Sequence, residues 1–422
     1  MAPADVSAEL SELESSSTPP TDKAQGYNNL LAALLEDPTS PDISVNLNSF
    51  LDSIMTVGLG IVASRPLLTT FVDALKRLSE AASRIAVGQH VIDVLQSRVV
   101  SFAEQDANVR ELLAGAYEEM EEHHSAARVL QGIQLDSSQR TVADNDKVKI
   151  WIRIVRNYLE EDDTTNAEAF LNRAKNLLYK CEDQGLRLMF QLSQARILDA
   201  HRKFLDACQV YHTLSFSPAI VDEERMKALS SAIVCAVLAP AGPLRSRTLG
   251  KLYKDERAAQ LPEFGILEKM FLDRLLSPAE VEKFAANLAS HQLAQTADGS
   301  TVLTKAVIEH NLLGTSRLYD NIAVDELGEL LGLSGDQAEE YAARMIEQGR
   351  VTGRIDQIDG LIFFDGNDGT GERSSLGQSD RIVGGELRKW DGNVQGIAEE
   401  VEKVTSLLQN EHPNFVALHL VH

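Results

Sequence analysis

The spacing of hydrophobic residues predicts α-helices over most of the chain. From residue 28 onward, apolar side chains recur at helical intervals, as in the series Leu30, Leu31, Leu34 and Leu35. Residues at this spacing share one face of a helix, which packs inward while the opposite face meets solvent. The same period continues through residue 104. We therefore predict a mainly α fold.

A repeat of about forty residues is superimposed on this helical pattern. Three times an alanine follows a Tyr or Leu by nine residues, at offsets of 41 and 40: Tyr117 and Ala126, Tyr158 and Ala167, Leu198 and Ala207. Two-helix repeats place a small residue where the paired helices cross closely. A fourth copy at Val237 and Ser246 is interrupted by Pro240 and Pro243. We predict a TPR-like helical-repeat solenoid, an arm over residues 26–220, which presents an extended binding surface.

The second half of the chain predicts a winged helix. Three short helical patterns, around Val307, Leu330 and Tyr341, precede two apolar runs that flank Asp359-Gly360, a strong hairpin signal. The third helix should begin at the capping box Ser334–Gln337 and end at Gly349. We predict a domain over residues 221–365, with a helical part followed by a winged helix at 301–365 and its short β-hairpin.

The two ends differ from the interior. Residues 1–25 are rich in Ser, Glu, Pro and Thr and predict a disordered acidic tail, and the Gly-rich residues 366–385 predict a flexible loop. A helix is predicted at 386–412 because apolar residues alternate in steps of three and four along it: Leu387, Trp390, Val394, Ile397, Val401, Val404 and Leu408. Such a heptad seam packs against other helices. The neighbours are either partner proteins or this chain's own domain.

Composition narrows the function classes. The 40 basic and 63 acidic residues give a net charge of −23, which opposes binding to phosphate backbones and anionic lipid. Three widely spaced cysteines predict neither a disulfide framework nor a zinc site. The N-terminus has no secretory signal pattern, and no apolar run approaches membrane-spanning length. We expect an intracellular, soluble protein with neither nucleic acid nor membrane as a partner.

A winged helix raises the question of DNA binding. Residues 321–365 contain ten acidic residues and three arginines, a net charge of −7, so nucleic-acid binding is the weaker alternative. An exposed hairpin edge can instead extend a sheet into a neighbouring molecule. We predict a partner-binding edge that consists of Arg350, Val351, Arg354 and Ile355.

No catalytic, cofactor-binding or metal-binding residues are predicted. Gly58, Gly60 and Ala63 match a loose dinucleotide fingerprint, but the helical flanks favour small residues at a helix crossing. His123 and His124 are adjacent and would point in different directions on a helix, so they would not chelate a metal together. An enzymatic function is therefore the hypothesis with the least support.

These features together resemble the PCI family, whose members are subunits of the proteasome lid, the COP9 signalosome and an initiation-factor complex. The motifs are most similar to the signalosome's subunit 4 branch: residues 126–133, 152–163 and 167–174 in the repeats, and 325–333, 343–350 and 355–363 in the winged helix. A proteasome-lid subunit is the closest alternative because it shares the whole architecture.

The resemblance implies a non-catalytic scaffold that supports removal of the ubiquitin-like modifier NEDD8 from cullin–RING ubiquitin ligases. Its implied partners are PCI subunits 2 and 7, met through winged-helix edges, and MPN subunits 5 and 6. The last helix would join a shared bundle, and the arm would help sense the cullin substrate. The implied location is the cytoplasm and nucleus, with no cofactor.

Overall fold

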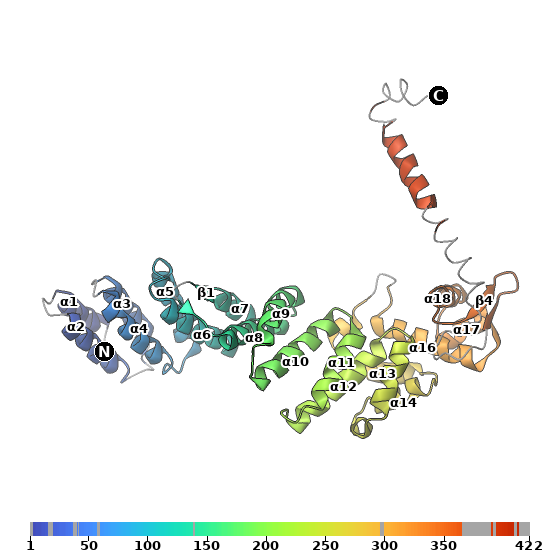
Figure 1. Ribbon diagram of the computed structural model, residues 1–422, viewed down its shortest axis with the longest axis horizontal. Helices are drawn as coiled ribbons and strands as arrows, with labels where there is room; N and C mark the ends of the chain where they lie inside the picture. Colours follow the sequence, from blue (N-terminus) through green and yellow to red (C-terminus); the bar gives the residue numbers. More distant parts are fainter. Residues whose placement is uncertain are drawn as a thin grey trace. The chain divides into compact units, whose positions relative to one another are not determined.

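The computed structural model describes residues 3–15, 20–36, 40, 42–56, 60–137, 140–295, 299–364, 390, 394–408 and 412. Two compact units divide the chain (Figure 1), Met1–Ala236, called the arm unit, and Val237–His422, called the C-terminal unit. We predicted this boundary between residues 220 and 221. Helix α12 (Asp222–Leu238) instead belongs almost wholly to the arm unit. No helix in the described part of the chain has the length and apolar character that crossing a membrane requires.

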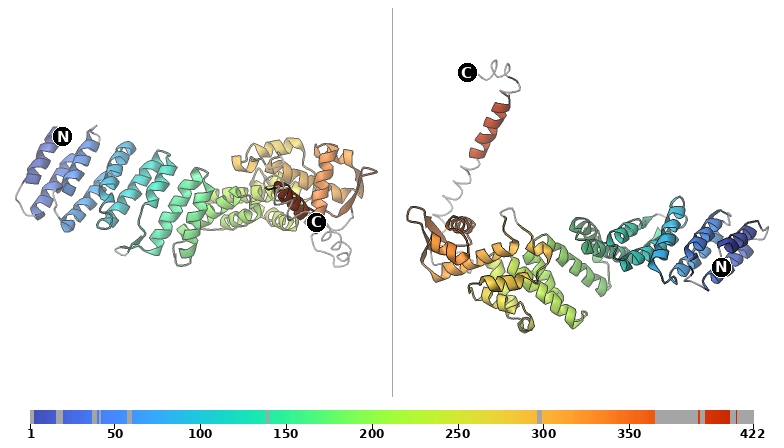
Figure 2. Two further views of the ribbon diagram at one scale, coloured as in Figure 1. Left: turned by 90° about the horizontal axis from the view of Figure 1, so that it is seen from above. Right: turned by 180° about the vertical axis from the view of Figure 1, so that it is seen from behind.

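The described part of the arm unit is built from helices stacked side by side (Figure 2) and one hairpin with strands of two residues each. Its elements before α12 are α1 (Pro3–Ser15), α2 (Pro20–Leu34), α3 (Ile43–Thr56), α4 (Ile61–Leu75), α5 (Ala81–Gln96), α6 (Ala103–Glu119), α7 (His123–Gln131), β1 (Asp136–Ser137), β2 (Arg140–Thr141), α8 (Asp144–Glu160), α9 (Thr164–Leu178), α10 (Gln184–Ala200) and α11 (Phe204–Ser215).

The predicted disordered tail at residues 1–25 is wrong. Helix α1 and the first turn and a half of α2 occupy this segment. Val6 and Leu10 are 1% and 4% exposed and belong to the same core as Phe50 on α3. They lie four residues apart, so one face of α1 packs inward even though the surrounding sequence is acidic and polar. Composition alone did not distinguish this short amphipathic helix from a disordered segment.

The predicted repeat corresponds to the helix pairs α6–α7, α8–α9 and α10–α11. Ala126, Ala167 and Ala207 are all completely buried, as small residues at close helix crossings should be. The repeat extends to the turn that joins each pair. Glu121, Asp162 and Arg202 have φ angles of 61°, 57° and 60°, and each following residue donates its backbone N–H to the carbonyl of Tyr117, Tyr158 or Leu198. A left-handed residue followed by this bond ends each first helix.

We expect a stabilising substitution in the turn between α8 and α9. Asp162 is exposed and adopts a left-handed backbone that favours glycine. We expect Asp162→Gly to raise the free energy of unfolding by about 0.5–1 kcal/mol, because glycine adopts this conformation without steric strain. Thermal unfolding of the full chain measures the change. Asp162→Ala is the control: it retains the Cβ strain, and an equal gain from alanine would contradict the explanation.

The C-terminal unit contains a helical part and a winged helix. The elements of the helical part are α13 (Pro243–Tyr253), the 3-10 helix η1 (Glu256–Gln260), α14 (Phe264–Phe271), α15 (Pro278–Ala285), the 3-10 helix η2 (Ser290–Leu293) and α16 (Val302–Leu318). The winged helix uses α16 as its first helix and continues with β3 (Asn321–Ala323), α17 (Val324–Leu331), α18 (Gly335–Glu347), β4 (Gly353–Asp356) and β5 (Leu361–Phe364).

The winged helix confirms the three predicted helices and the hairpin, and adds a strand. Its antiparallel sheet has the order β3-β5-β4, and Ile362 at its centre is opposite Ile322 and Ile355. β3 was not predicted because three residues carry no detectable alternation. Ser334 and Gln337 form the expected capping box, and Gly349 has a φ of 68° at the end of α18. The predicted loop at 366–385 lies outside the described residues.

The dinucleotide fingerprint near residue 60 has no structural support. The residues before it belong to helix α3 instead of a strand, so the βαβ context is absent from this described part of the chain. Gly60 is the N-cap of α4, with a φ of 81° and no atom near the position of a side chain. Our interpretation of Gly60 as a close helix crossing is therefore wrong, because a backbone requirement explains this glycine.

Candidate assembly surfaces

Strand β4 forms one edge of the winged-helix sheet. It pairs with β5 on one side only, and no strand of the described chain covers its other side. Arg354 is the exposed residue of this edge, and its guanidinium lies over the Phe363 ring, 4.8 Å from the ring centroid. Ile355 is half-buried and packs against the winged-helix core. An open edge of this kind can accept a strand from another molecule.

The other two predicted edge residues hold the domain together from inside. Val351 is 5% exposed and belongs to the winged-helix core. The Arg350 side chain lies 2.7 Å from the Glu309 carboxylate on α16. Both backbone N–H groups bond to the carbonyl of Met345 as the chain leaves α18. The edge strand therefore begins at Gly353, three residues after the first predicted edge residue, because this turn must close first.

Gly353 is the one position on β4 where a side chain would collide with the neighbouring strand. A Cβ built there would lie well inside van der Waals contact of the Phe363 carbonyl oxygen. We expect Gly353→Ala to lower the free energy of unfolding of the C-terminal unit by about 1–3 kcal/mol, since the β4–β5 backbone would have to separate. The matched control is Gly265→Ala on α14, where nothing lies within 4 Å. Urea denaturation followed by circular dichroism measures both; equal destabilisation by the two variants would contradict this account.

Helix α16 is the centre of the C-terminal unit. Three successive polar residues, Glu309, His310 and Asn311, are 6%, 2% and 6% exposed. Successive helical residues point about 100° apart, so burial of all three requires packing on most of the helix circumference. Each must therefore find a polar partner in the interior.

Glu309 connects the helical part to the winged helix. Its Oε2 atom accepts a hydrogen bond from the Ala241 backbone N–H at 3.1 Å and lies 2.7 Å from Nη1 of Arg350. The Arg245 guanidinium, from α13, is also buried, and Met270 Sδ accepts one of its N–H groups. Burial lowers the pKa of Arg245 to about 10, while the Glu309 charge opposes that shift. Glu309 thus balances two cations from the two parts of the unit.

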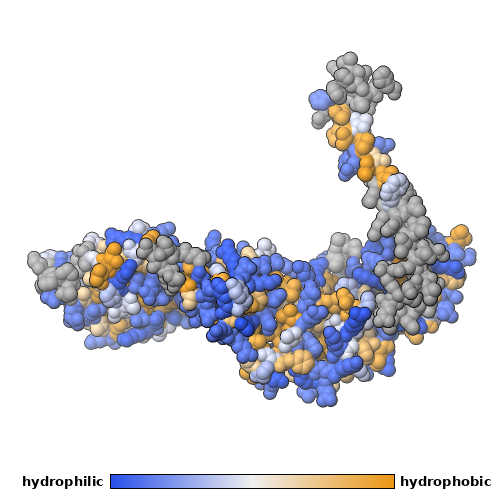
Figure 3. Space-filling model, viewed as in Figure 1, coloured by the Kyte–Doolittle hydropathy of each residue, from blue (hydrophilic) through white to orange (hydrophobic). Residues whose placement is uncertain are grey.

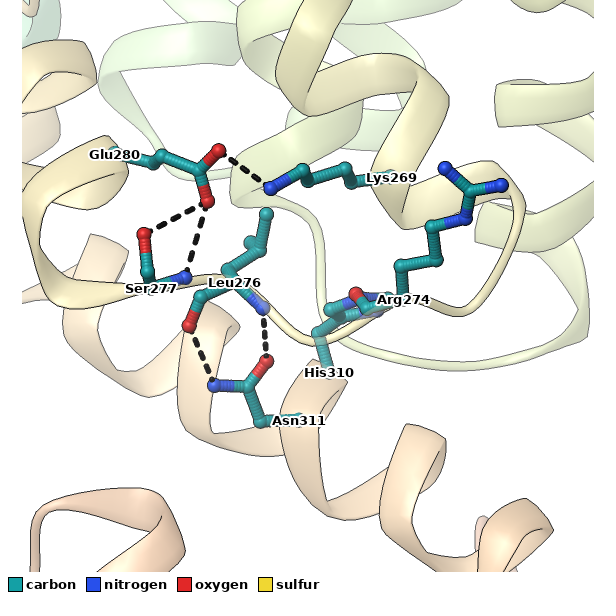
Figure 4. A network of polar contacts seen from close by, with 7 residues as sticks. All are labelled: Lys269, Arg274, Leu276, Ser277, Glu280, His310 and Asn311. Carbon is teal, nitrogen blue, oxygen red and sulfur yellow. Dashed lines mark hydrogen bonds and ion pairs between the residues drawn. The ribbon is translucent and has the colours of Figure 1, made fainter.

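Asn311 and His310 fix the segment between α14 and α15 (Figure 4). The Asn311 side chain accepts from the Leu276 N–H at 2.9 Å and donates to the Leu276 carbonyl at 3.2 Å. His310 Nε2 lies 2.9 Å from the Arg274 carbonyl oxygen and donates to it. Beside them, Glu280 accepts from Lys269 and from the hydroxyl and N–H of Ser277, which caps α15. This network holds α14, α15 and α16 together.

His310 makes stability depend on pH. Burial, aided by the Arg245 charge, lowers its pKa from 6.5 to about 4. The unfolded chain therefore binds a proton that the folded chain does not, and stability is lost as the pH falls from 6.5 towards 4. We expect this group to contribute a slope of about 1.4 kcal/mol per pH unit in that window. Urea denaturation at several pH values should show a shallower slope for His310→Asn; an unchanged slope would contradict the assignment.

The heptad seam lies on a helix at residues 394–408 and is exposed to solvent. The exposed fractions of Val394, Ile397, Val401 and Val404 are 45%, 63%, 59% and 56%. The hydrophobic stripe is visible along the helix in Figure 3. Trp390 is also helical and exposed, Leu408 is half-buried, and Leu387 lies outside the described residues. A continuous apolar stripe on one helix is suited to packing against other helices.

Two family models match the chain. The model described as "PSMD12/CSN4, N-terminal" matches residues 5–223, and the PCI domain model matches residues 286–365. The first therefore covers the arm, including α1, and the second covers the winged helix together with part of the helical segment before it.

Curated relatives cover nearly the whole chain. A protein named COP9 signalosome complex subunit 4 from Emericella nidulans is 54% identical over 410 residues, covering 96% of this chain and 97% of its own length. The subunit of the same name from Neurospora crassa is 49% identical, with 94% of each chain covered. That from Dictyostelium discoideum is 41% identical, with 93% of this chain and 94% of its own covered. The chain belongs to the COP9 signalosome subunit 4 family.

The buried polar residues of α16 were not among the site residues predicted for this subunit 4 family member. The pattern around Val307 predicted the helix but not its role. A run of Glu309, His310 and Asn311 within an apolar helical pattern was the available signal, because polar residues inside a buried helix require partners. In the described residues, no group of three or more His, Cys, Asp or Glu side chains is arranged to hold a metal ion.

Proposed function

We propose that the chain is a non-catalytic scaffold subunit of the COP9 signalosome and supports removal of NEDD8 from cullin–RING ubiquitin ligases. The observation that carries this proposal is the exposed heptad seam at residues 394–408 in a member of the subunit 4 family. A seam left exposed by its own chain is suited to a helix bundle shared between subunits.

The two units take different roles in this proposal. The open β4 edge, with Arg354 and Ile355, extends into a sheet edge of a neighbouring PCI subunit, either subunit 2 or subunit 7. The seam helix joins the bundle, and the chain contacts the MPN subunits 5 and 6. The stacked arm helps sense the cullin substrate, since such arrays present long surfaces. The complex acts in the cytoplasm and nucleus.

Identification of native partners tests this proposal. The full chain, tagged at its N-terminus, is purified from cells at near-native expression and its partners are quantified by mass spectrometry. We expect signalosome subunits in near-stoichiometric amounts and cullins in smaller amounts. The matched comparison is a variant that lacks residues 387–422, which should lose most of these partners while its thermal unfolding is unchanged. Recovery of proteasome-lid subunits instead, or of the same partners without residues 387–422, would contradict the proposal.

A further inference from the structure

An exposed patch in the arm unit combines aliphatic and cationic side chains. Ile61 and Val62 in the first turn of α4 are 49% and 90% exposed, and Val100, in the turn after α5, is 62% exposed. Arg65, one turn after Ile61 and Val62 on α4, and Arg98, two residues before Val100, are also exposed. We call these five residues the aliphatic–arginine patch.

Hydrogen bonds connect the two segments that form the patch. The Nε and Nη2 atoms of Arg65 donate to the Ser101 carbonyl at 3.0 and 2.8 Å. Nη1 of Arg98 donates to the Met55 carbonyl at 3.4 Å. Since Arg65 lies three and four residues after Val62 and Ile61, it shares their side of α4. The Arg65 bonds therefore hold its guanidinium against the turn that contains Val100, while Arg98, two residues before Val100, is bonded to the end of α3.

The arginines of the arm unit fall into two groups: some pair with a carboxylate, and others, including the two arginines of the patch, have no carboxylate partner among the described residues. Arg84, Arg153 and Arg196 each pair with a glutamate, Glu119, Glu118 and Glu160 respectively. By contrast, neither Arg65 nor Arg98 forms an ion pair with any carboxylate of the described residues. In a chain with a net charge of −23, two exposed arginines without a carboxylate partner are available to pair with an acidic group of another molecule.

We infer that the aliphatic–arginine patch binds an acidic peptide segment of a partner protein, with aliphatic side chains set against Ile61, Val62 and Val100 and carboxylates against Arg65 and Arg98. Arginine pairs with carboxylates through two parallel hydrogen bonds, and its unused N–H groups here are open to solvent. An amphipathic helix supplies both groups, because residues three and four positions apart lie side by side. This inference does not depend on the proposed function.

The negative net charge of the chain makes an extended anionic surface a less favourable ligand than a short acidic peptide. Nucleic acid and anionic membranes are extended arrays of negative charge, which the remainder of this acidic chain would repel. A short peptide can place its carboxylates on the two arginines alone. Anionic lipid vesicles are nevertheless a direct comparison in the experiment.

Fluorescence anisotropy of a labelled model peptide tests the inference. The probe is a helical peptide of about sixteen residues with Leu at i, i+3, i+4 and i+7 spacing and Glu on both flanks of that face. The full chain should bind it saturably, and Val62→Glu or Arg98→Glu should each weaken binding by about tenfold or more. Raising the NaCl concentration should also weaken binding, because the carboxylate–arginine contacts are exposed.

Four controls separate the contributions. Val221→Glu, at an aliphatic residue of the same unit that is 70% exposed, should leave binding unchanged. A peptide with Gln in place of Glu, and another with Ser in place of Leu, should each bind at least about tenfold more weakly. Thermal unfolding of Val62→Glu should match the unsubstituted chain, since this side chain is 90% exposed. The inference is overturned by absent saturable binding, by equal binding of the Gln peptide, by no effect of Val62→Glu, or by preferential binding of anionic vesicles.

Discussion

Replacement of Glu309 by alanine is expected to lower the free energy of unfolding of the C-terminal unit by about 3–5 kcal/mol, as removal of one partner from a buried ion pair does. The carboxylate is 6% exposed and lies between Arg350 of the winged helix and the Ala241 N–H of the helical part. Without it, Arg350 would lose its ion-pair partner, and the buried Arg245 would lose the negative charge that opposes the lowering of its pKa. Urea denaturation of the full chain, followed by circular dichroism, measures the loss.

A double-mutant cycle shows whether the charge is the cause. Arg350→Ala in the Glu309→Ala background should cost less than Arg350→Ala alone, because the arginine has already lost its partner. Glu329→Ala, at an exposed glutamate of α17, is the matched control and should change stability by less than about 0.5 kcal/mol. Additive effects of the two substitutions would contradict a direct Glu309–Arg350 coupling.

Val401→Asp is expected to abolish assembly of the chain into its complex without unfolding it. Val401 is 59% exposed in the chain itself, so an aspartate there meets water. In a bundle, the same carboxylate would be buried against apolar neighbours, and the cost of desolvating it would weaken association by about a hundredfold or more. Co-purification of partner subunits with the full-length variant measures the effect, and thermal unfolding of the isolated chain confirms its fold.

Glu399→Gln provides the matched control for the seam. Glu399 is on the same helix, two residues before Val401, so it points to a different side. Its substitution should leave assembly intact. A fall in the unfolding temperature of the isolated Val401→Asp chain, with partners retained, would instead show that the seam packs against the chain's own domain.

Local signals in the sequence were sufficient to predict the repeat and the winged helix. Buried alanines such as Ala167, the capping box at Ser334 and the left-handed Gly349 each depend on neighbours within a few residues. Strand β3 could not be predicted, because its three residues are defined only by pairing with β5.

Partners distant in the sequence explain most of what sequence analysis missed. Glu309 is a buried anion only because residues 68 positions earlier and 41 positions later reach it. Val351 reads as a strand residue in isolation, yet the turn after α18 turns it into the core. In helix α1, the spacing of Val6 and Leu10 was a signal of one apolar helix face. The acidic and polar composition of the segment nevertheless favoured disorder, because the surface of α3 against which these residues pack is distant in the sequence.

Cleavage of a cullin–NEDD8 conjugate tests whether the chain is a non-catalytic scaffold, as proposed. The purified isolated chain and an assembled signalosome that contains it are incubated separately with the conjugate, and release of NEDD8 is followed by gel electrophoresis. We expect cleavage by the assembled complex and none above background by the isolated chain, because the proposed scaffold role leaves catalysis to another subunit. Release of NEDD8 by the isolated chain would contradict it.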